Sequence, residues 1–435
     1  MQAYETTRRS VAVIGSGVAG LTAAYALSGR DRVTLFEADS RLGGHAHTHY
    51  VDDGTGNTVG VDSAFLVHND RTYPTLNRLF DDLGVHTRNT DMSMSVRADA
   101  SGLEYAGARG LGGLFPTLGN LARPKYLAML GEVKRFHRKA TALLRSEDDS
   151  TATVGQFLDQ HGFSPYFAEH FMTPLVAAVW SCAPGVALDY PARYLFIFLE
   201  HHGMLTVFGS PTWRTVVGGS NTYVQAIARR LDEVHTSRPV AGVRRVPAGV
   251  QVSAAGQEAQ IFDAVVIATH SDQALALLEE PTAAERSVLG AMPYSTNHAL
   301  LHTDESVLPR RTRARASWNY LLTPAQDDVL VTYDVTRLMK LTGPRRFLVT
   351  LGGHNHIDPD RIIAEMTYQH PLYTPESVSA QRLLPTLDDD RVVFAGAYQG
   401  WGFHEDGAAS GLRAAQRLGA VWPQQSSTTE KVAAA

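Results

Sequence analysis

Three glycines close to the start of the sequence constrain the fold more than any other feature. The pattern G-x-G-x-x-G is formed by Gly15, Gly17 and Gly20. An apolar run at 10–14 precedes it, a helical pattern at 21–28 follows it, and a second apolar run at 32–36 ends at an acid, Glu37. Strand, glycine turn, helix and strand in this order are typical of the βαβ unit that binds dinucleotides. We therefore predict a doubly wound α/β domain at the start of the chain.

The spacing predicts a physical role for each of these residues. Gly15 permits the tight turn, Gly17 lets the backbone approach a pyrophosphate, and Gly20 allows the helix to pack closely on the strand. The helix N-terminus stabilises phosphate charge, and Glu37 is placed to accept hydrogen bonds from the ribose hydroxyls of adenosine. A tight turn that binds nothing is the alternative, but it leaves the spaced acid unexplained. Nicotinamide and flavin dinucleotides both fit this pattern.

Length and composition limit the remaining possibilities. The chain has 435 residues, which favours two domains. Its net charge is -5, so no basic field extends over the whole molecule to hold nucleic acid or an anionic membrane surface. The single cysteine, Cys182, cannot form an internal disulfide, which suits a reducing compartment such as the cytoplasm. The most apolar stretch, 194–208, contains charged residues and is shorter than the ~20 residues of a membrane-spanning helix, so we expect no such helix and only peripheral contact with lipid stays possible.

Apolar periodicity divides the rest of the chain into elements. Helices are predicted within 105–144, 154–180, 223–231 and 407–418, and strands at 243–252, 264–268, 297–302, 327–333, 345–351 and 391–394. The run at 264–268 is apolar throughout, which is typical of a central parallel strand. The stretch 243–252 has Pro247 and Gly249 near its middle and predicts a hairpin.

The residues after Glu37 distinguish between the dinucleotides. They read ADSRLGGH, and Glu37, Arg41, Gly43, Gly44 and His45 resemble the E-x-x-x-R-x-G-G-R segment of the flavin amine oxidases and phytoene-desaturase-like enzymes. Segments at 61–76, 216–231 and 394–418 resemble the same superfamily in the same order. The resemblance is strongest to a broadly defined group of FAD-dependent amine-oxidase-like proteins and extends distantly to FAD-dependent polyunsaturated fatty acid isomerases. It implies FAD as the cofactor.

The resemblance also implies an architecture, which is a Rossmann-type FAD-binding domain with a discontinuous α+β substrate domain. The FAD-binding domain is expected at 1–95, 206–292 and 388–422, the substrate domain at 96–205 and 293–387, and a disordered tail at 423–435. In the family the glycine pair carries the chain around the flavin and an arginine follows it; here His45 stands in that place. The implied cofactor-binding residues are Gly15, Gly17, Gly20, Glu37, Arg41, Gly43, Gly44, His45, Val240, Gly396, Glu405, Asp406 and Gly407.

The terminal segment has a direct physical interpretation. A helix that starts near Gly407 with Asp406 as its N-cap would point free N–H groups at N1 and the C2 carbonyl of a flavin. An ordinary capped helix packed on the sheet is the alternative. His404 and Glu405 directly precede this helix, so either His404 acts as a general acid or base, or both residues only brace the cofactor.

Flavin amine oxidases commonly carry a lysine that holds a water at flavin N5. The comparable stretch here, at 294–302, has Asn297 or His298 in that position, and the nearest lysine is Lys340. The missing lysine counts against fast oxygen reactivity and an amine oxidase. No cysteine lies in the terminal segment, so we predict non-covalent FAD, with a histidyl link through His45 as the alternative.

The side chains of the second domain indicate the substrate class. Eighteen histidines invite a metal site, but no metal-binding spacing accompanies them, and we predict none. An aromatic group consists of Phe163, Tyr166, Phe167, Phe171, Trp180, Tyr194, Phe196, Phe198, Phe208 and Trp213. Most of these residues are expected in the core, but the group favours a hydrophobic, lipid-like substrate over an amino acid, whose carboxylate needs an arginine. Arg193 and Arg214 are the candidates for such a clamp, or for holding a fatty acid carboxylate.

Four functions, in three classes, therefore remain for this chain. The first is an FAD-dependent oxidoreductase that moves hydride between flavin N5 and a carbon of a hydrophobic, unsaturated substrate. The second is a redox-neutral double-bond isomerase, in which the hydride returns to another carbon of the same molecule. An amine oxidase is a further alternative, and a non-catalytic FAD- or lipid-binding protein is the third class. The oligomeric state and the electron acceptor do not follow from the sequence.

Overall fold

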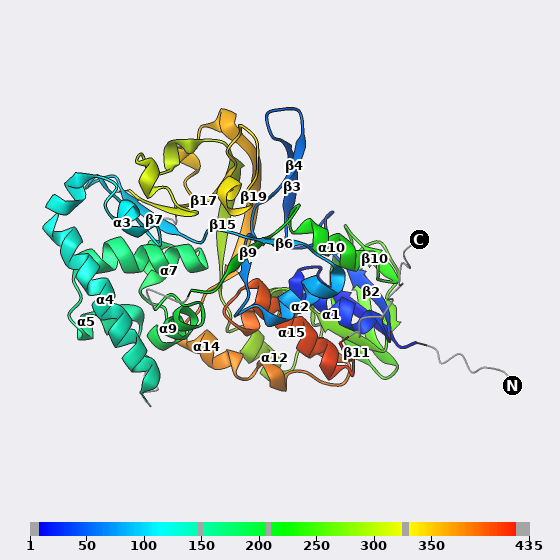
Figure 1. The fold of residues 1–435 in the computed structure, drawn as a ribbon. Coiled ribbons are helices and arrows are strands. Elements are labelled where there is room, and N and C mark those ends of the chain that lie inside the picture. The colour runs from blue at the N-terminus through cyan, green and yellow to red at the C-terminus, as the bar shows by residue number, and fades with distance from the viewer. Residues whose placement is uncertain (1–7, 147–150, 206–209, 324–329, 423–435) are drawn as a thin grey trace, which may run out of the picture.

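A computed structural model describes residues 8–146, 151–205, 210–323 and 330–422. The predicted tail at 423–435, Phe208 and the first part of the predicted strand at 327–333 lie outside the described residues. Two bodies of structure stand side by side in Figure 1, one around the glycine motif and one around a larger sheet. Both N- and C-terminal ends of the described chain lie on the side of the glycine motif.

A parallel five-stranded sheet carries the glycine motif. In order across the sheet the strands are β10 (Glu233–His235), β2 (Arg32–Phe36), β1 (Ser10–Ile14), β14 (Ala264–Ile267) and β20 (Val392–Phe394). Alternate residues of β1 enter two different cores, since Val11 and Val13 face one side while Ala12 and Ile14 face the other. A strand that is buried on both sides needs an unbroken apolar sequence. The strands predicted at 10–14, 32–36, 264–268 and 391–394 are thereby confirmed.

Helices cover one side of this sheet and a small sheet covers the other. The helices are α1 (Val18–Ser28), α2 (Pro74–Leu83), α10 (Asn221–Ala228) and α15 (His404–Arg417). The opposite side holds β11 (Val240–Val246), β12 (Gly249–Ala254), β13 (Gln260–Phe262), α11 (Ser271–Leu277) and α12 (Ala283–Leu289). Helices α1 and α15 can approach closely because Gly411 has no side chain. A Cβ at this position would collide with the carbonyl oxygen of Ala19. This contact fixes the start of α15 beside the glycine motif.

The second body is built on a mixed seven-stranded sheet. In order its strands are β19 (Ile362–Pro371), β15 (Tyr294–His302), β18 (Leu348–Leu351), β17 (Val331–Asp334), β16 (Trp318–Leu322), β7 (Met94–Ala98) and β8 (Leu103–Gly107). The predicted strands at 297–302 and 345–351 are confirmed as β15 and β18. The helix predicted from residue 105 is wrong at its start, because residues 103–107 pair with β7 as an antiparallel hairpin. The described part of the strand predicted at 327–333 belongs to β17.

Helices pack around this sheet and form most of the left side of Figure 1. They are α3 (Gly110–Leu114), α4 (Pro124–Arg145), α5 (Val154–Gln160), α6 (Pro165–Phe167), α7 (Thr173–Trp180), α8 (Pro184–Ala187), α9 (Ala192–His201) and α13 (Val335–Leu338). Helix α14 (Pro375–Gln381) instead lies beside α12 of the first body. Smaller sheets of β3 (Thr48–Asp52) with β4 (Thr58–Asp62), and of β5 (His68–Asn69), β9 (Trp213–Val216) and β6 (Thr87–Asn89), lie between the bodies. No helix among the described residues has the length and apolar character needed to cross a bilayer.

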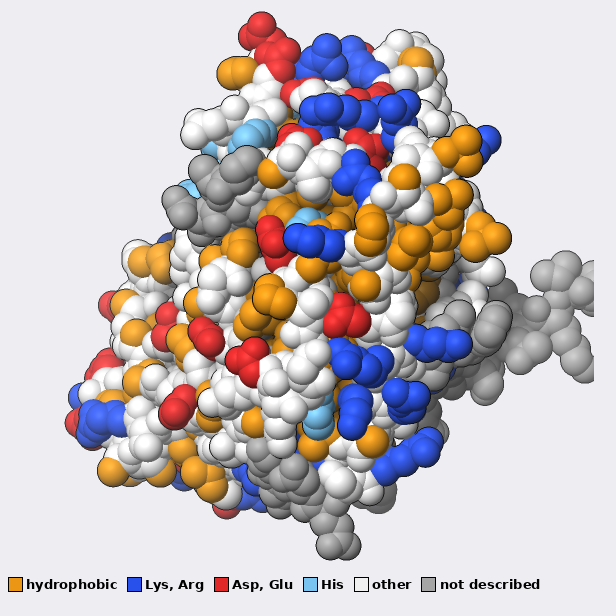
Figure 2. All heavy atoms as spheres, turned by 90° about the vertical axis from the view of Figure 1, so that its left-hand side faces the viewer, with side chains coloured by type: hydrophobic (Ala, Val, Ile, Leu, Met, Phe, Trp, Pro, Cys, Tyr) orange, Lys and Arg blue, Asp and Glu red, His pale blue; other side chains and the backbone are white. Residues whose placement is uncertain are grey.

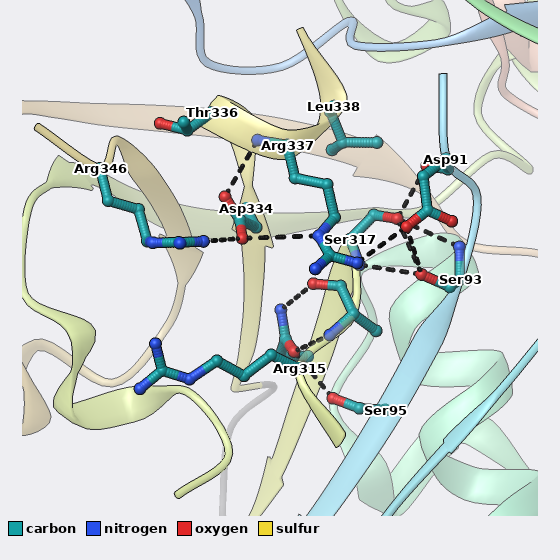
Figure 3. A network of polar contacts seen from close by, with 12 residues as sticks. Asp91, Ser93, Ser95, Arg315, Ser317, Asp334, Thr336, Arg337, Leu338 and Arg346 are labelled. Carbon is teal, nitrogen blue, oxygen red and sulfur yellow. Dashed lines mark hydrogen bonds and ion pairs between the residues drawn. The ribbon is translucent and has the colours of Figure 1, made fainter. Parts of the chain in front are cut away.

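A polar network joins the two chain segments that build the second body (Figure 3). The Ser93 and Ser317 hydroxyls lie 3.1 Å apart where β7 meets β16, and Ser95 donates to Asn319 Oδ1 at 2.8 Å. Arg337 Nη1 contacts Asp91 at 2.9 Å, which ties α13 to the segment before β7. These bonds explain how strands more than 200 residues apart in sequence pair in parallel.

Candidate functional site

The N-terminus of α1 has the features of a phosphate site. Its N-cap is Gly17, no side chain caps it, and its first turn contains no acid. Gly15 adopts φ 97°, and a Cβ on Gly20 would collide with the Gly15 carbonyl oxygen. A Cβ on Gly17 would meet nothing within 4 Å, so this residue faces open space. Free N–H groups at an open, uncapped helix start bind anions, and the geometry therefore fits the pyrophosphate of FAD.

Glu37 lies at the end of β2, next to the glycine turn. Its Oε2 accepts from the Ser16 N–H at 2.8 Å and from the Ser16 hydroxyl at 2.5 Å, and its Oε1 accepts from the Asp39 N–H at 2.9 Å. The carboxylate is therefore oriented by the backbone on both sides. Each carboxylate oxygen can accept a second hydrogen bond, so the ribose contact predicted for Glu37 stays a prediction that this geometry permits.

The glycine pair passes directly over the glycine motif. A Cβ on Gly44 would lie 3.2 Å from the Gly17 Cα, and the Gly43 N–H contacts the Ser16 hydroxyl at 3.1 Å. Arg41 Nη1 donates to the Gly44 carbonyl at 2.8 Å, which holds this turn in place. The two segments that resemble the FAD motifs are thus brought together in space.

Two further motif segments meet at a buried acid. Asp62 accepts from the Ser220 N–H at 2.9 Å, from its hydroxyl at 2.8 Å and from the Thr48 hydroxyl at 2.5 Å. Burial raises the pKa of Asp62 to about 6, although these hydrogen bonds act in the opposite direction. The segment at 61–76 and the segment at 216–231 are therefore fastened to each other. Gly219 adopts φ 96° in the turn that makes this possible.

Helix α15 begins three residues earlier than predicted. It runs from His404, and its N-cap is Phe403, which has extended φ and ψ. Asp406 is therefore not the N-cap; it is the third residue of the helix, and its Oδ2 accepts from the Phe403 N–H at 2.9 Å. Burial raises the pKa of Asp406 to about 7. A Cβ on Gly407 would lie 2.5 Å from a methyl of Val18, so the first turns of α1 and α15 touch.

Glu405 is turned toward another helix. Its two carboxylate oxygens accept from the N–H groups of Thr75 and Leu76, each at 2.9 Å, at the start of α2. Helix α2 has no capping side chain of its own, because its N-cap is Tyr73. Glu405 therefore supplies the cap from a distant part of the chain. The Glu405 side chain is thus occupied at α2, and a cofactor contact through Glu405 stays a prediction.

His404 is held by two aromatic neighbours. Its ring stacks on Phe65 at 3.7 Å between centroids, and its Nε2 lies 3.1 Å from the Tyr223 hydroxyl. Burial lowers the pKa of His404 to about 3, so its imidazole is neutral. This packing favours the bracing role over the catalytic one.

A group of neutral histidines lies where the two bodies meet. His45 and His370 rings are 5.3 Å apart, and the amide of Asn297 contacts His370 Nδ1 at 2.9 Å. Burial lowers the pKa of His45 far below its ordinary value and that of His370 to about 4. His45 Nε2 and His270 Nδ1 are shielded from solvent and have no hydrogen-bond partner among the described residues. Unpaired buried nitrogens of this kind fit a ligand with polar atoms.

The two strand candidates separate because side chains alternate along β15. Asn297 is buried beside His370, while His298 is exposed and faces His354 with ring centroids 5.4 Å apart. Lys340, the nearest lysine in the sequence, is exposed at the end of α13. Asn297 therefore joins the histidine group, and His298 and Lys340 do not.

Aromatic side chains of the second body close on the segment that precedes α15. Phe198 stacks on Phe403 at 4.8 Å, Trp180 Nε1 donates to the Trp401 carbonyl at 3.0 Å, and the Tyr194 hydroxyl donates to the Gly400 carbonyl at 2.7 Å. We call these residues the aromatic cluster, which comprises Trp180, Tyr190, Tyr194, Phe198, Tyr373, Trp401 and Phe403. Its members come from α7, from α9 and the residues before it, from the residues after β19, and from the segment that precedes α15.

The two predicted carboxylate clamps are bound elsewhere. Arg193 Nη1 donates to the Leu143 carbonyl at the end of α4 at 2.9 Å. Arg214 Nε donates to the Thr87 hydroxyl at 2.8 Å, and its Nη1 donates to Asn89 Oδ1. Both guanidinium groups are therefore used to join strands and helices.

The remaining predicted residues lie at the rims of the parallel sheet. Val240 opens β11 and pairs with Ala254. The Gly396 N–H follows β20 and donates to the Ser410 hydroxyl at 2.9 Å, and a Cβ there would collide with the Tyr398 ring. Cys182 is fully buried, and burial raises its thiol pKa to about 12. It belongs to the core of the second body rather than to the FAD motifs.

Sequence reasoning missed three residues of this region. His270 begins α11 and packs on Tyr294, and His370 and Tyr368 come from β19. The sequence offers one indication for each: His270 closely follows the apolar run 264–268, and Tyr368 and His370 lie in the strand that pairs with β15. Pairing is required to see it, because β15 and β19 are more than 60 residues apart.

Comparisons with known proteins agree with this geometry. The family model described as "Flavin containing amine oxidoreductase" matches residues 18–419. Tryptophan 2-monooxygenase from Allorhizobium ampelinum is 52% identical over 48 residues, which are 11% of this chain and 7% of that protein. Polyamine oxidase 5 from Oryza sativa subsp. japonica is 33% identical over 143 residues, 32% of this chain and 26% of that protein. The matched stretches thus span less than a third of these relatives.

Solved structures are similar over nearly the whole chain. Cyclohexylamine oxidase from Brevibacterium oxydans has a TM-score of 0.67 at 18% identity, covering 94% of this chain and 98% of that one. A CLA-producing fatty acid isomerase from P. acnes has a TM-score of 0.65 at 14% identity, covering 95% of this chain and 99% of that one. At these identities the likeness shows the fold alone. It confirms the predicted α/β class with an FAD-binding fold of the amine oxidase type.

Proposed function

Because the chain belongs to the family of flavin containing amine oxidoreductases, and is thus an FAD-dependent oxidoreductase, we propose that it transfers hydride between flavin N5 and a carbon of a hydrophobic, unsaturated, lipid-like substrate. The flavin, when bound, supplies a two-electron acceptor or donor at N5. The residues of this chain would bind it, position the substrate and exclude water.

The observation that carries the substrate class is the aromatic cluster. Its rings press on the segment before α15 through hydrogen bonds and stacking, and its members are uncharged. A substrate carboxylate close to these rings would need an arginine, but Arg193 and Arg214 are bound to α4 and β6. An apolar chain of a substrate loses no hydrogen bonds against such a surface.

The FAD-binding residues are part of the same proposal. The open start of α1 with Gly15, Gly17 and Gly20 is proposed to hold the pyrophosphate, and Glu37 the ribose. Backbone at Val240 is proposed to contact the adenine. Arg41, Gly43, Gly44, His45, Gly396 and the first turn of α15, Glu405, Asp406 and Gly407, are proposed to surround the flavin. Binding is proposed to be non-covalent, since the one cysteine is buried in the second body.

The histidine group is proposed to handle protons near the reacting carbon. Asn297 donates to His370 Nδ1, which leaves the proton of the neutral imidazole on Nε2 as a donor. Asn297 acts through His370 and is therefore a positioning residue. His404 remains a candidate for catalysis, in second place behind this pair because Phe65 and Tyr223 already hold its ring.

The experiment is anaerobic incubation of the flavin-loaded protein with unsaturated fatty acids and with an amine panel, following the flavin absorbance band and product mass. We expect bleaching by the fatty acids and a product two hydrogens lighter. Asn297→Ala should slow bleaching by about 10² or more, and His298→Ala, on the opposite side of the same strand, should leave the rate unchanged. Bleaching by amines alone, or no bleaching by any compound, would contradict the proposal.

Two observations favour alternatives that the same experiment separates. The likeness in fold to a fatty acid isomerase keeps the double-bond isomerase as a candidate. Catalytic formation of a product of unchanged mass, without lasting bleaching, would identify it. Local identity to polyamine oxidases keeps the amine oxidase as a candidate, which loss of the amino group from an amine would identify. Flavin that stays with the protein pellet after acid precipitation would contradict non-covalent binding.

A further inference from the structure

An apolar patch is exposed on the outer side of the second body, around α3, the short helix η1 (Leu118–Ala122) and the start of α4. Its leucines are Leu111, Leu118, Leu121 and Leu127, with exposed fractions of 76, 85, 52 and 41%. Figure 2 views the molecule from this side, and hydrophobic side chains gather there between groups of Lys and Arg. Exposed apolar side chains concentrated in one place mark an interaction surface.

Cations flank the leucines on the side of α4. Leu127, Lys134, Arg138 and Arg145 are separated by seven, four and seven residues, so they form one exposed stripe along this helix. Lys125, Lys134, Arg138 and Lys139 form no ion pair with any described residue. Their charge is therefore available to a partner.

Cations also flank the leucines on the opposite side. Helix η4 (Thr312–Ala314) contacts α3, and Arg311 and Arg313 beside it are exposed. Two nearby acids among the described residues are already engaged. Glu104 accepts from the N–H groups of Arg310 and Arg311, and Glu132 binds Ser164 and Arg135. This surface is basic although the whole chain carries a net charge of -5.

We propose that this surface, the α3–α4 face, docks on an anionic lipid bilayer. Leucines enter the boundary between headgroups and acyl chains, while Lys and Arg at the rim contact lipid phosphates. A second copy of the chain is a poor occupant, because two basic faces repel each other. A nucleic acid would leave the leucines without a role. The proposal goes beyond the hydride transfer and does not rest on it.

A cavity beside the stripe is consistent with a phosphate headgroup. It has a volume of about 610 Å³ and lies along the last turns of α4. The described residues that line it include His137, Arg138, Thr141 and Arg145, and none of these described residues is an acid. The bilayer would therefore meet α4 along its length as well as at its leucine-flanked start.

The test is flotation of the flavin-loaded protein with vesicles of phosphatidylcholine alone or mixed equally with phosphatidylglycerol, at low and high NaCl. We expect binding to the mixed vesicles at low salt and little binding to phosphatidylcholine. Charges at the surface of anionic bilayers contribute about fivefold each in partitioning, so Lys134→Gln, Arg138→Gln and Lys139→Gln together should weaken binding about 100-fold. High salt should reduce binding in the same way.

Two further variants separate this face from net charge. Arg229→Gln, Arg286→Gln and Arg382→Gln together remove the same charge from exposed positions outside the α3–α4 face and should leave binding nearly unchanged. Leu118→Ser with Leu121→Ser should weaken binding while the charge stays constant. Melting temperatures close to that of the unchanged protein show that each variant is folded.

Several results would overturn the proposal. The first is that the unchanged protein does not bind the mixed vesicles. The second is that the triple variant on the α3–α4 face and the triple variant outside it lose vesicle binding equally. The third is that the leucine variant binds as strongly as the unchanged protein. A dimer that the leucine variant abolishes would instead assign the face to a second copy. Turnover of substrate in solution is measured separately, so its failure or success does not affect this result.

Discussion

The clearest quantitative prediction concerns Asp406, the carboxyl that folds back at the start of α15. Burial raises its pKa from 3.8 to about 7, so the folded protein binds this proton more tightly than the unfolded chain does. The stabilising effect of that proton is fully present below pH 3.8 and is lost as the pH rises through 7. One pKa unit is about 1.36 kcal/mol, and integrating between pH 5 and pH 8 gives a loss of about 2.5 kcal/mol.

Asp406→Asn removes this titration and keeps an oxygen that accepts from the Phe403 N–H. We expect the stability of the variant relative to wild type to increase by about 2.5 kcal/mol from pH 5 to pH 8. Urea unfolding at four pH values, with excess FAD in every sample, measures the difference. Asp390→Asn, at a side chain that is 97% exposed, removes a charge from solvent and is the control. Parallel pH profiles for Asp406→Asn and wild type would refute the reasoning.

The remaining predictions concern the glycine motif, the cap of α2 and the aromatic cluster. Gly20→Ala should abolish flavin retention, because the added Cβ would collide with the Gly15 carbonyl oxygen. Gly29→Ala is the control and should retain FAD, because a Cβ there meets nothing within 4 Å. The ratio of flavin to protein absorbance measures retention, and a Gly20→Ala protein that still carries flavin would contradict the site. Glu405→Gln should lower the free energy of unfolding by about 2 kcal/mol, because the charged acceptor of the Thr75 and Leu76 N–H groups is lost. Urea titration measures this difference, and an unchanged free energy would show that α2 needs no cap. Tyr194→Phe should lower the free energy of unfolding by only about 1 kcal/mol, because Gln381 also donates to the Gly400 carbonyl. A loss several times larger in the same titration would show that the tyrosine positions the whole segment before α15.

Local chemistry explains what the sequence predicted. The strands at 10–14 and 264–268 are continuous apolar runs, and a strand buried between two layers requires that composition. The glycine pattern predicts its own backbone geometry, because Gly15 adopts a positive φ and there is no space for a side chain at Gly20. Features of this kind are visible in the sequence because each residue type has one structural reason to be there.

The start of α15 shows where local reasoning fails. A Ser, Thr, Asn or Asp at the N-cap is the usual sign of a helix start, and Asp406 matched it. The structure instead places Asp406 at the third position, where its side chain reaches back to the Phe403 N–H, and Phe403, whose ring packs on Phe198, is the N-cap. The contact that decides the helix start comes from α9, and no local pattern records it.

The histidine group makes the same point for the site. The sequence predicted that either Asn297 or its neighbour His298 lies at this position. The alternation of side chains along a strand does not by itself show which of the two faces inward. The antiparallel register of β15 with β19 decides it, since Asn297 lies opposite Tyr368 and comes within 2.9 Å of His370. His45 then approaches from the FAD motif. His45 and His270 come from the first body, and His370 and Asn297 come from the second, so this group of three neutral imidazoles and one amide depends on the contact between the two bodies.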